Sequence, residues 1–108
     1  MTDFITKQGN TRTALKATLT SVQGSVTLAT VTGVEFIMCT TLFEKVIARP
    51  VDDAMNLPDV VVVFTEEELN NIGDFLGEFI VTYTDGKKER FPSDKYITIK
   101  ILKNVGVV

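Results

Sequence analysis

Hydrophobic and polar residues alternate along most of this chain, in short runs separated by turn residues. From Ala14 to Thr20, apolar side chains alternate with lysine and threonine, which gives a strand one buried and one solvated face. Similar runs recur to the end of the sequence. They cover residues 14–20, 34–40, 44–48, 60–64, 75–83, 87–91 and 96–102, with a shorter run at 26–28. This spacing predicts an all-β fold, an antiparallel β-sandwich of about seven strands.

Two of these runs are apolar on both faces. The strand from Val34 to Thr40 carries hydrophobic residues at almost every position, which predicts a central place in its sheet or a place at an interface. The run from Val60 to Phe64 is uninterrupted, which predicts a strand buried on both sides.

The connections between the runs contain recognisable signals. Residues 51–59 are rich in acidic and turn residues and predict a surface loop. Thr65 and Glu68 have the spacing of a capping box, which predicts one short helical turn near residues 65–72. Asp85 and Gly86 between two strand patterns predict a hairpin with a type I′ turn.

Composition places the chain among globular proteins. It has 108 residues, of which 44% are hydrophobic and 23% are charged, so we expect one domain spanning residues 1–108. The net charge of −3 argues against a nucleic-acid partner, because neutralising phosphates requires basic residues. The longest apolar run, Val60 to Phe64, is too short to span a membrane. The first residues lack the pattern of a signal peptide, so we expect synthesis in a cytoplasm and no membrane partner.

The sequence offers few candidate catalytic residues. Histidine is absent, which removes the commonest general base and metal ligand. The single cysteine, Cys39, lies in an apolar strand, where we expect a buried and inert thiol. Asp52, Asp53 and Asp59 lie close in sequence, but their spacing fits no calcium loop. We therefore expect no catalytic residue, no cofactor and no metal site; a hydrolase using carboxylates alone is a distant alternative.

Three segments are candidates for contacts with other proteins: the N-terminal arm, residues 41–43 and residues 105–108. The last of these is apolar beyond the final strand, which predicts either a frayed end or a strand that pairs with a neighbouring subunit. The candidate interface residues are Leu42, Phe43, Val105, Val107 and Val108.

Read from end to end, the chain resembles the N-terminal immunoglobulin-like domain of phage baseplate upper proteins, which are virion components of tailed bacteriophages. The similar motifs occur in the same order over roughly the whole chain. They are residues 7–11, 15–19, 31–38, 61–65, 77–92 and 96–101. The longest, 77–92, combines Phe79, Val81 and Tyr83 with the Asp85-Gly86 turn. Asn10 stands where the family usually has aspartate. The family continues into helical and receptor-carrier segments, whereas this sequence ends at Val108, so we expect a stand-alone module.

The resemblance implies a non-enzymatic, immunoglobulin-like structural protein of a virion. Its expected partners are other virion proteins, either major capsid or tail and baseplate proteins, and further copies of itself. Capsid decoration is favoured over a tail or baseplate position because the connecting segments are missing. The alternative is an adhesion module that binds carbohydrate or a host receptor. Such a site would use aromatic side chains, and Tyr83 and Tyr96 are both expected to serve in strand packing.

Overall fold

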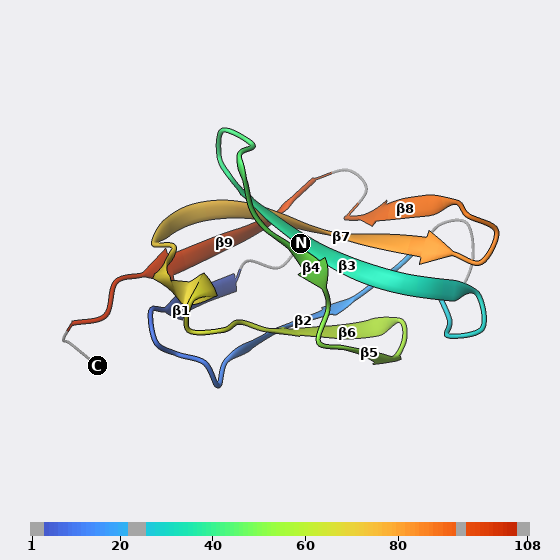
Figure 1. The fold of residues 1–108 in the computed structure, drawn as a ribbon, viewed down its shortest axis with the longest axis horizontal. Helices are drawn as coiled ribbons and strands as arrows, with labels where there is room; N and C mark the ends of the chain where they lie inside the picture. Colours follow the sequence, from blue (N-terminus) through green and yellow to red (C-terminus); the bar gives the residue numbers. More distant parts are fainter. Residues whose placement is uncertain (1–3, 22–25, 93–94, 106–108) are drawn as a thin grey trace.

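The computed structural model describes residues 4–21, 26–92 and 95–105, and within these ranges the chain is almost entirely β. Nine strands and one 3₁₀ turn form two sheets that pack face to face (Figure 1). The all-β sandwich expected from the alternating pattern is confirmed.

The larger sheet has six strands. Five follow the order β1-β9-β7-β3-β4, and β8 pairs with the second half of β7. The strand bounds are β1 (Phe4–Lys7), β3 (Val31–Thr40), β4 (Lys45–Pro50), β7 (Gly73–Tyr83), β8 (Lys88–Phe91) and β9 (Ile97–Leu102). The strand expected at 34–40 is β3, which lies between β7 and β4, so the prediction of a central position is confirmed.

The smaller sheet has three strands in the order β2-β6-β5. Its bounds are β2 (Ala14–Thr18), β5 (Asp53–Asn56) and β6 (Asp59–Val63). Val60 and Val62 are fully buried, whereas Val63 is exposed. The prediction that this run is buried on both sides is therefore wrong: one face of the smaller sheet packs on the core, and the other faces solvent.

The core lies between the sheets and is built from the inward residues of both. Phe36, Phe64 and Phe79 are the largest of its fully buried side chains, each at most 1% exposed. Phe36 contacts both other rings, with centroids 5.8 Å from Phe64 and 5.4 Å from Phe79. Each fully buried aromatic or aliphatic side chain contributes roughly 1.5–3 kcal/mol by leaving water, so this cluster supplies much of the stability that holds the sheets together.

The capping box predicted at Thr65 and Glu68 is confirmed. The Glu68 amide donates to Thr65 Oγ1 at 3.1 Å, and the Thr65 amide donates to the Glu68 carboxylate at 2.9 Å. The helical turn is short, a 3₁₀ segment η1 (Glu68–Asn70), and it buries Leu69 completely.

The N-terminal arm is part of the larger sheet, which the sequence did not predict. β1 pairs in parallel with β9, with Phe4 opposite Ile99. The larger sheet is therefore mixed, and the expectation of purely antiparallel pairing is wrong at this edge. A four-residue strand with only two inward side chains gives too little alternation to be recognised.

Three local predictions are also wrong. Residues 26–28 form no strand: Val26 is buried, but a turn follows in which the Thr30 amide donates to the Thr27 carbonyl. The expected loop at 51–59 contains β5 and the first residue of β6.

In the β7–β8 hairpin, Gly86 alone has positive φ, and its amide donates to the Tyr83 carbonyl. The loop is thus one residue longer than a type I′ turn requires, because a two-residue turn precedes the left-handed glycine.

Candidate functional site

The turn between β3 and β4 projects beyond the two sheets (Figure 1) and is held by hydrogen bonds to one residue. The Thr40 side-chain oxygen accepts from the amides of Leu42 at 3.2 Å and Glu44 at 3.1 Å. The Thr40 carbonyl accepts from the Phe43 amide at 2.8 Å. Phe43 adopts a φ of 64°, the left-handed region that non-glycine residues rarely enter. The turn is therefore fixed in a shape that directs its two apolar side chains outward.

Those two side chains and a tyrosine form an exposed apolar surface, here called the tip patch: Leu42, Phe43 and Tyr96. Their exposed fractions are 79%, 63% and 46%. The rings of Phe43 and Tyr96 meet edge to face, with centroids 5.7 Å apart. Such a ring pair gains about 0.5–1.5 kcal/mol beyond the area that it buries, so the contact helps to fix Phe43 in place.

Tyr96 is the member of the tip patch that sequence reasoning misjudged. It was expected to serve in strand packing, but it precedes β9 by one residue and is nearly half exposed. The signal was present in the alternation of β9. Ile97 is buried, so its neighbour Tyr96 must face the opposite side. Tyr83, the other tyrosine, is half-buried and donates to Glu89 at 2.6 Å. Burial first, and then this hydrogen bond, raise its pKa to about 12.

The outer face of the larger sheet continues from the tip patch with half-buried side chains. Cys39 pairs with Leu76 across β3 and β7 on this face. The thiol is thus half-buried, where a fully buried position was expected. Burial, and then the charge of Glu78, raise the pKa of Cys39 above its usual value. A raised pKa keeps the thiol protonated at neutral pH, which makes it a poor nucleophile.

The candidate contact segments are not brought together into one surface. Figure 1 shows the turn between β3 and β4 and the end of the chain beyond β9 at separate places on the molecule. Val105 follows β9 and is fully exposed. Val107 and Val108 lie outside the described residues. In the N-terminal arm, Phe4–Lys7 form β1 and pair with β9 of the same chain.

The acidic residues considered for calcium are engaged with protein groups. Asp52 accepts from the Arg49 guanidinium at 3.1 Å and from the Val63 amide at 2.6 Å. Asp53 accepts from the Met55 amide, and Asp59 accepts from the Thr18 hydroxyl. Over residues 4–21, 26–92 and 95–105, no three cysteine or acidic side chains group in a way that could hold a metal ion. In the same part of the chain, no helix has the length and hydropathy needed to cross a bilayer.

No protein-family model matches the sequence, and no curated protein matches it. Among solved structures, the fold is similar to that of CopC from Methylosinus trichosporium OB3b, with a TM-score of 0.57. The alignment covers all of this chain and 91% of that one. The shared feature is the β-sandwich. The two sequences are only 11% identical, so the similarity shows the fold and carries no ligand or activity over to this chain.

Proposed function

We propose that this chain is a non-enzymatic structural protein of a tailed-phage virion, made in the host cytoplasm and docked in many copies on the particle. Its partners are other virion proteins and further copies of itself, and we place it on the capsid surface in preference to the tail or baseplate. The resemblance of its ordered motifs to baseplate upper proteins supports the virion setting.

The observation that carries the docking role is the tip patch. Two apolar side chains project on a turn that hydrogen bonds to Thr40 hold in one shape. Phe43 and Tyr96 are aromatic, and aromatic side chains dominate the energetically important centres of protein interfaces. A fixed turn also loses little conformational freedom on binding, so more of the contact energy appears as affinity.

The experiment removes the tip patch and compares the variant with an equally exposed apolar site elsewhere. In the test variant, Leu42→Ser is combined with Phe43→Asn, because asparagine tolerates positive φ. The control is Met55→Ser, which removes an apolar side chain that is 72% exposed on β5 of the other sheet. Each protein is mixed with particles that lack it, and the bound copies are counted after sedimentation.

Saturable binding over the shell that is lost in the tip variant and kept in Met55→Ser supports the proposal. Binding at only one end of the particle would assign the protein to the tail and not to the capsid. Equal binding by the wild type and the tip variant removes the tip patch as the docking site. Failure of the wild type to bind any particle contradicts the structural role.

The second candidate, a carbohydrate- or receptor-binding adhesion module, is favoured by one observation. The rings of Phe43 and Tyr96 meet at the surface, and exposed aromatic rings are the groups on which sugars stack. A glycan array distinguishes the two functions. Selective binding that Tyr96→Ala abolishes would put adhesion first, whereas binding to particles without binding to any glycan supports the structural role.

A further inference from the structure

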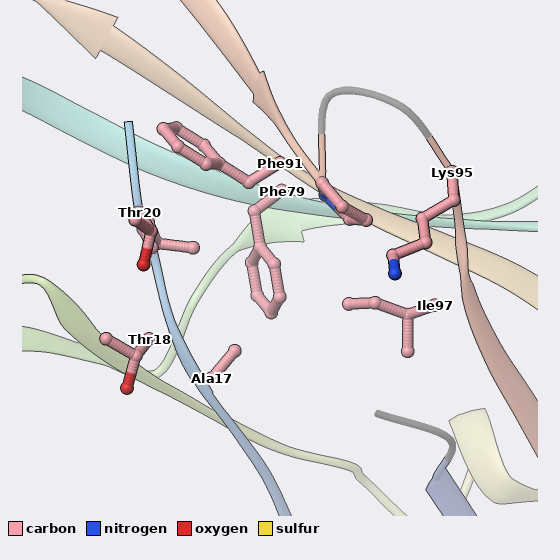
Figure 2. A pocket seen from close by; sticks show the side chains of 9 residues that line it. Ala17, Thr18, Thr20, Phe79, Phe91, Lys95 and Ile97 are labelled. Atoms are coloured by element: carbon pink, nitrogen blue, oxygen red, sulfur yellow. The ribbon is translucent and has the colours of Figure 1, made fainter. Parts of the chain in front are cut away.

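A cavity of about 270 Å³ opens between the two sheets, lined by residues other than those of the tip patch (Figure 2). Its lining is mostly apolar, with two threonines and one lysine. The lining residues are Ala17, Thr18, Leu19, Thr20, Phe79, Phe91, Pro92, Lys95 and Ile97. Figure 2 shows the Phe79 ring standing inside the cavity, with the chain from Ala17 to Thr20 on one side and Lys95 and Ile97 on the other.

The cavity has a structural cause in the larger sheet. β9 pairs with the first half of β7, from Gly73 to Gly77, and β8 pairs with the second half, from Phe79 to Thr82. The ladder of backbone hydrogen bonds along this edge of β7 is therefore interrupted between Gly77 and Phe79, where the chain passes from β8 to β9. On the facing strand β2, Ala17 is too small to fill the resulting gap.

The open edge of the smaller sheet lies beside this cavity. The Leu19 amide donates to the Pro58 carbonyl, and Ala17 pairs with Val60 two residues earlier. Bonded and non-bonded pairs alternate in an antiparallel ladder, so Lys16 and Thr18 direct their N–H and C=O groups away from β6. Among the described residues, no strand lies on that side of β2. Backbone donors and acceptors thus stand next to an apolar cavity, which is the arrangement that accepts an added strand.

We propose that residues 105–108 of a second copy of this chain add to the open edge of β2 and place the side chains of Val105 and Val107 in the cavity. The spacing fits, because side chains two residues apart in a strand lie on the same face. Val105 is fully exposed where the chain leaves β9, so burying it on a neighbour removes apolar surface from water.

The occupant comes from another copy because Val105 of the same copy is too close to Leu102 to reach the cavity. Ile97, which lines the cavity, lies five residues before Leu102 in β9, a distance of roughly 16 Å along a strand. Val105 follows Leu102 by three residues and can extend only about 10 Å from it. The contact is therefore between residues 105–108 of one copy and the flank of the next. It is a heterologous contact, which builds rings when the rotation closes and open chains when it does not.

The inference does not depend on the docking role of the tip patch, because the two surfaces share no residue. The test measures mass by light scattering over a range of protein concentrations. The wild type is expected to grow from one copy to larger assemblies as concentration rises, whereas Val105→Asp stays monomeric because it lacks the apolar side chain that the contact buries.

A matched pair of variants tests the acceptor edge. Thr18→Pro removes the N–H group that points away from β6, a change that edge strands tolerate. Thr18→Val keeps the N–H group and, like proline, removes the hydroxyl that donates to Asp59. We expect Thr18→Val to assemble and Thr18→Pro to remain monomeric, with circular dichroism showing that both are folded.

A synthetic peptide with the sequence of residues 102–108 provides a readout that is independent of assembly. Labelled peptide should bind the Val105→Asp protein in fluorescence anisotropy at least tenfold more tightly than a peptide carrying Asp at position 105. Equal binding of both peptides, or a wild type that stays monomeric at millimolar concentration, overturns the proposal. Binding of decanoate that Lys95→Gln weakens, with no binding of the peptide, would make the cavity a small-amphiphile site and also overturn it.

Discussion

At Gly77, β7 passes close to the side chains of neighbouring strands. A Cβ atom at this position would lie 2.7 Å from Ile99 Cδ1 and 3.3 Å from Phe36 Cε1. Both neighbours are buried core residues and have little room to move. Glycine is therefore required here by packing and not by its backbone freedom.

Replacing Gly77 by alanine is expected to destabilise the fold by about 1–3 kcal/mol, the usual cost of overpacking a core. Gly33→Ala is the control, because a Cβ there meets nothing within 4 Å. Ile99→Val removes Cδ1 and should recover part of the loss when combined with Gly77→Ala. Urea unfolding measures the free energy of unfolding of the wild type and of each variant, including Ile99→Val alone. An equal cost for the two glycine variants would show that packing is not the cause.

Thr6 presents the opposite situation, a polar group with nothing to bind. Its side chain is 5% exposed, and its hydroxyl has no hydrogen-bond partner among the described residues. Thr6→Val keeps the shape and removes the unpaired group, so we expect the free energy of unfolding to rise by about 1 kcal/mol. Thr18→Val, which breaks a bond to Asp59, should give no such gain in the same denaturation experiment. A loss of stability in Thr6→Val would show that this hydroxyl is satisfied in solution.

At the scale of elements, Arg49 joins β4 to η1 and to β6. Its guanidinium donates to the Glu68 carboxylate through Nε at 2.6 Å and Nη2 at 3.0 Å. It also donates to Asp52 and to the Val63 carbonyl. Burial of Glu68 opposes its ionisation, but the hydrogen bonds from Arg49 and from the Thr65 amide outweigh this and lower its pKa. The ion pair thus closes one side of the sandwich.

A lowered pKa makes this contact sensitive to acid. A carboxyl whose pKa is lower in the folded state stabilises the fold above its unfolded pKa, near 4.5, and this contribution is lost as the pH falls through the folded value. Glu68→Gln should therefore cost about 1.5–3 kcal/mol at pH 7, the range for hydrogen bonds to charged groups. The difference in the free energy of unfolding between this variant and the wild type should disappear as the pH falls below about 4.5. Unfolding measured at several pH values tests this, with Glu66→Gln, an exposed acid in the same segment, as the control. A gap that stayed constant in acid would contradict the expectation.

The elements that the sequence predicted well are those with long alternation or a specific local signal. β7 and β9 alternate over many residues, and the capping box at Thr65 and Glu68 depends on contacts three residues apart. β1 and β5 have four residues each, and their pairing partners are decided by the whole fold. The sequence also singled out Leu42 and Phe43 as candidate contact residues, and the structure shows that both are exposed. The sequence could not predict that Tyr96 meets them, because that contact joins segments more than fifty residues apart.

At the scale of the whole molecule, the sheets are built from pairings between distant parts of the chain. β3 pairs with β7, and β1 pairs with β9, which places Phe4 opposite Ile99. Such non-local topologies fold in milliseconds to seconds, because long loops must close before contacts form. We expect stopped-flow circular dichroism to show refolding in this range.

The same topology predicts the order in which the strands pair during folding. Phe4→Ala removes the stacking of this ring on Phe64 and should mainly speed unfolding, because the β1–β9 contact requires the longest closure and forms late. Phe79→Leu lies in the more local β7–β8 hairpin and should mainly slow folding. If Phe4→Ala slowed folding as strongly as Phe79→Leu, β1 would already be docked in the transition state.

The parallel pairing of β1 with β9 also has a mechanical consequence. A pull on the chain before Phe4 and after Leu102 draws two parallel neighbouring strands along their length in opposite directions. The hydrogen bonds that join Phe4–Lys7 to Ile99–Leu102 are then loaded together in shear and cannot open one at a time like a zipper. The first and last strands thus hold the two ends of the fold together, and stretching the molecule from its ends must break this pairing before the core is exposed.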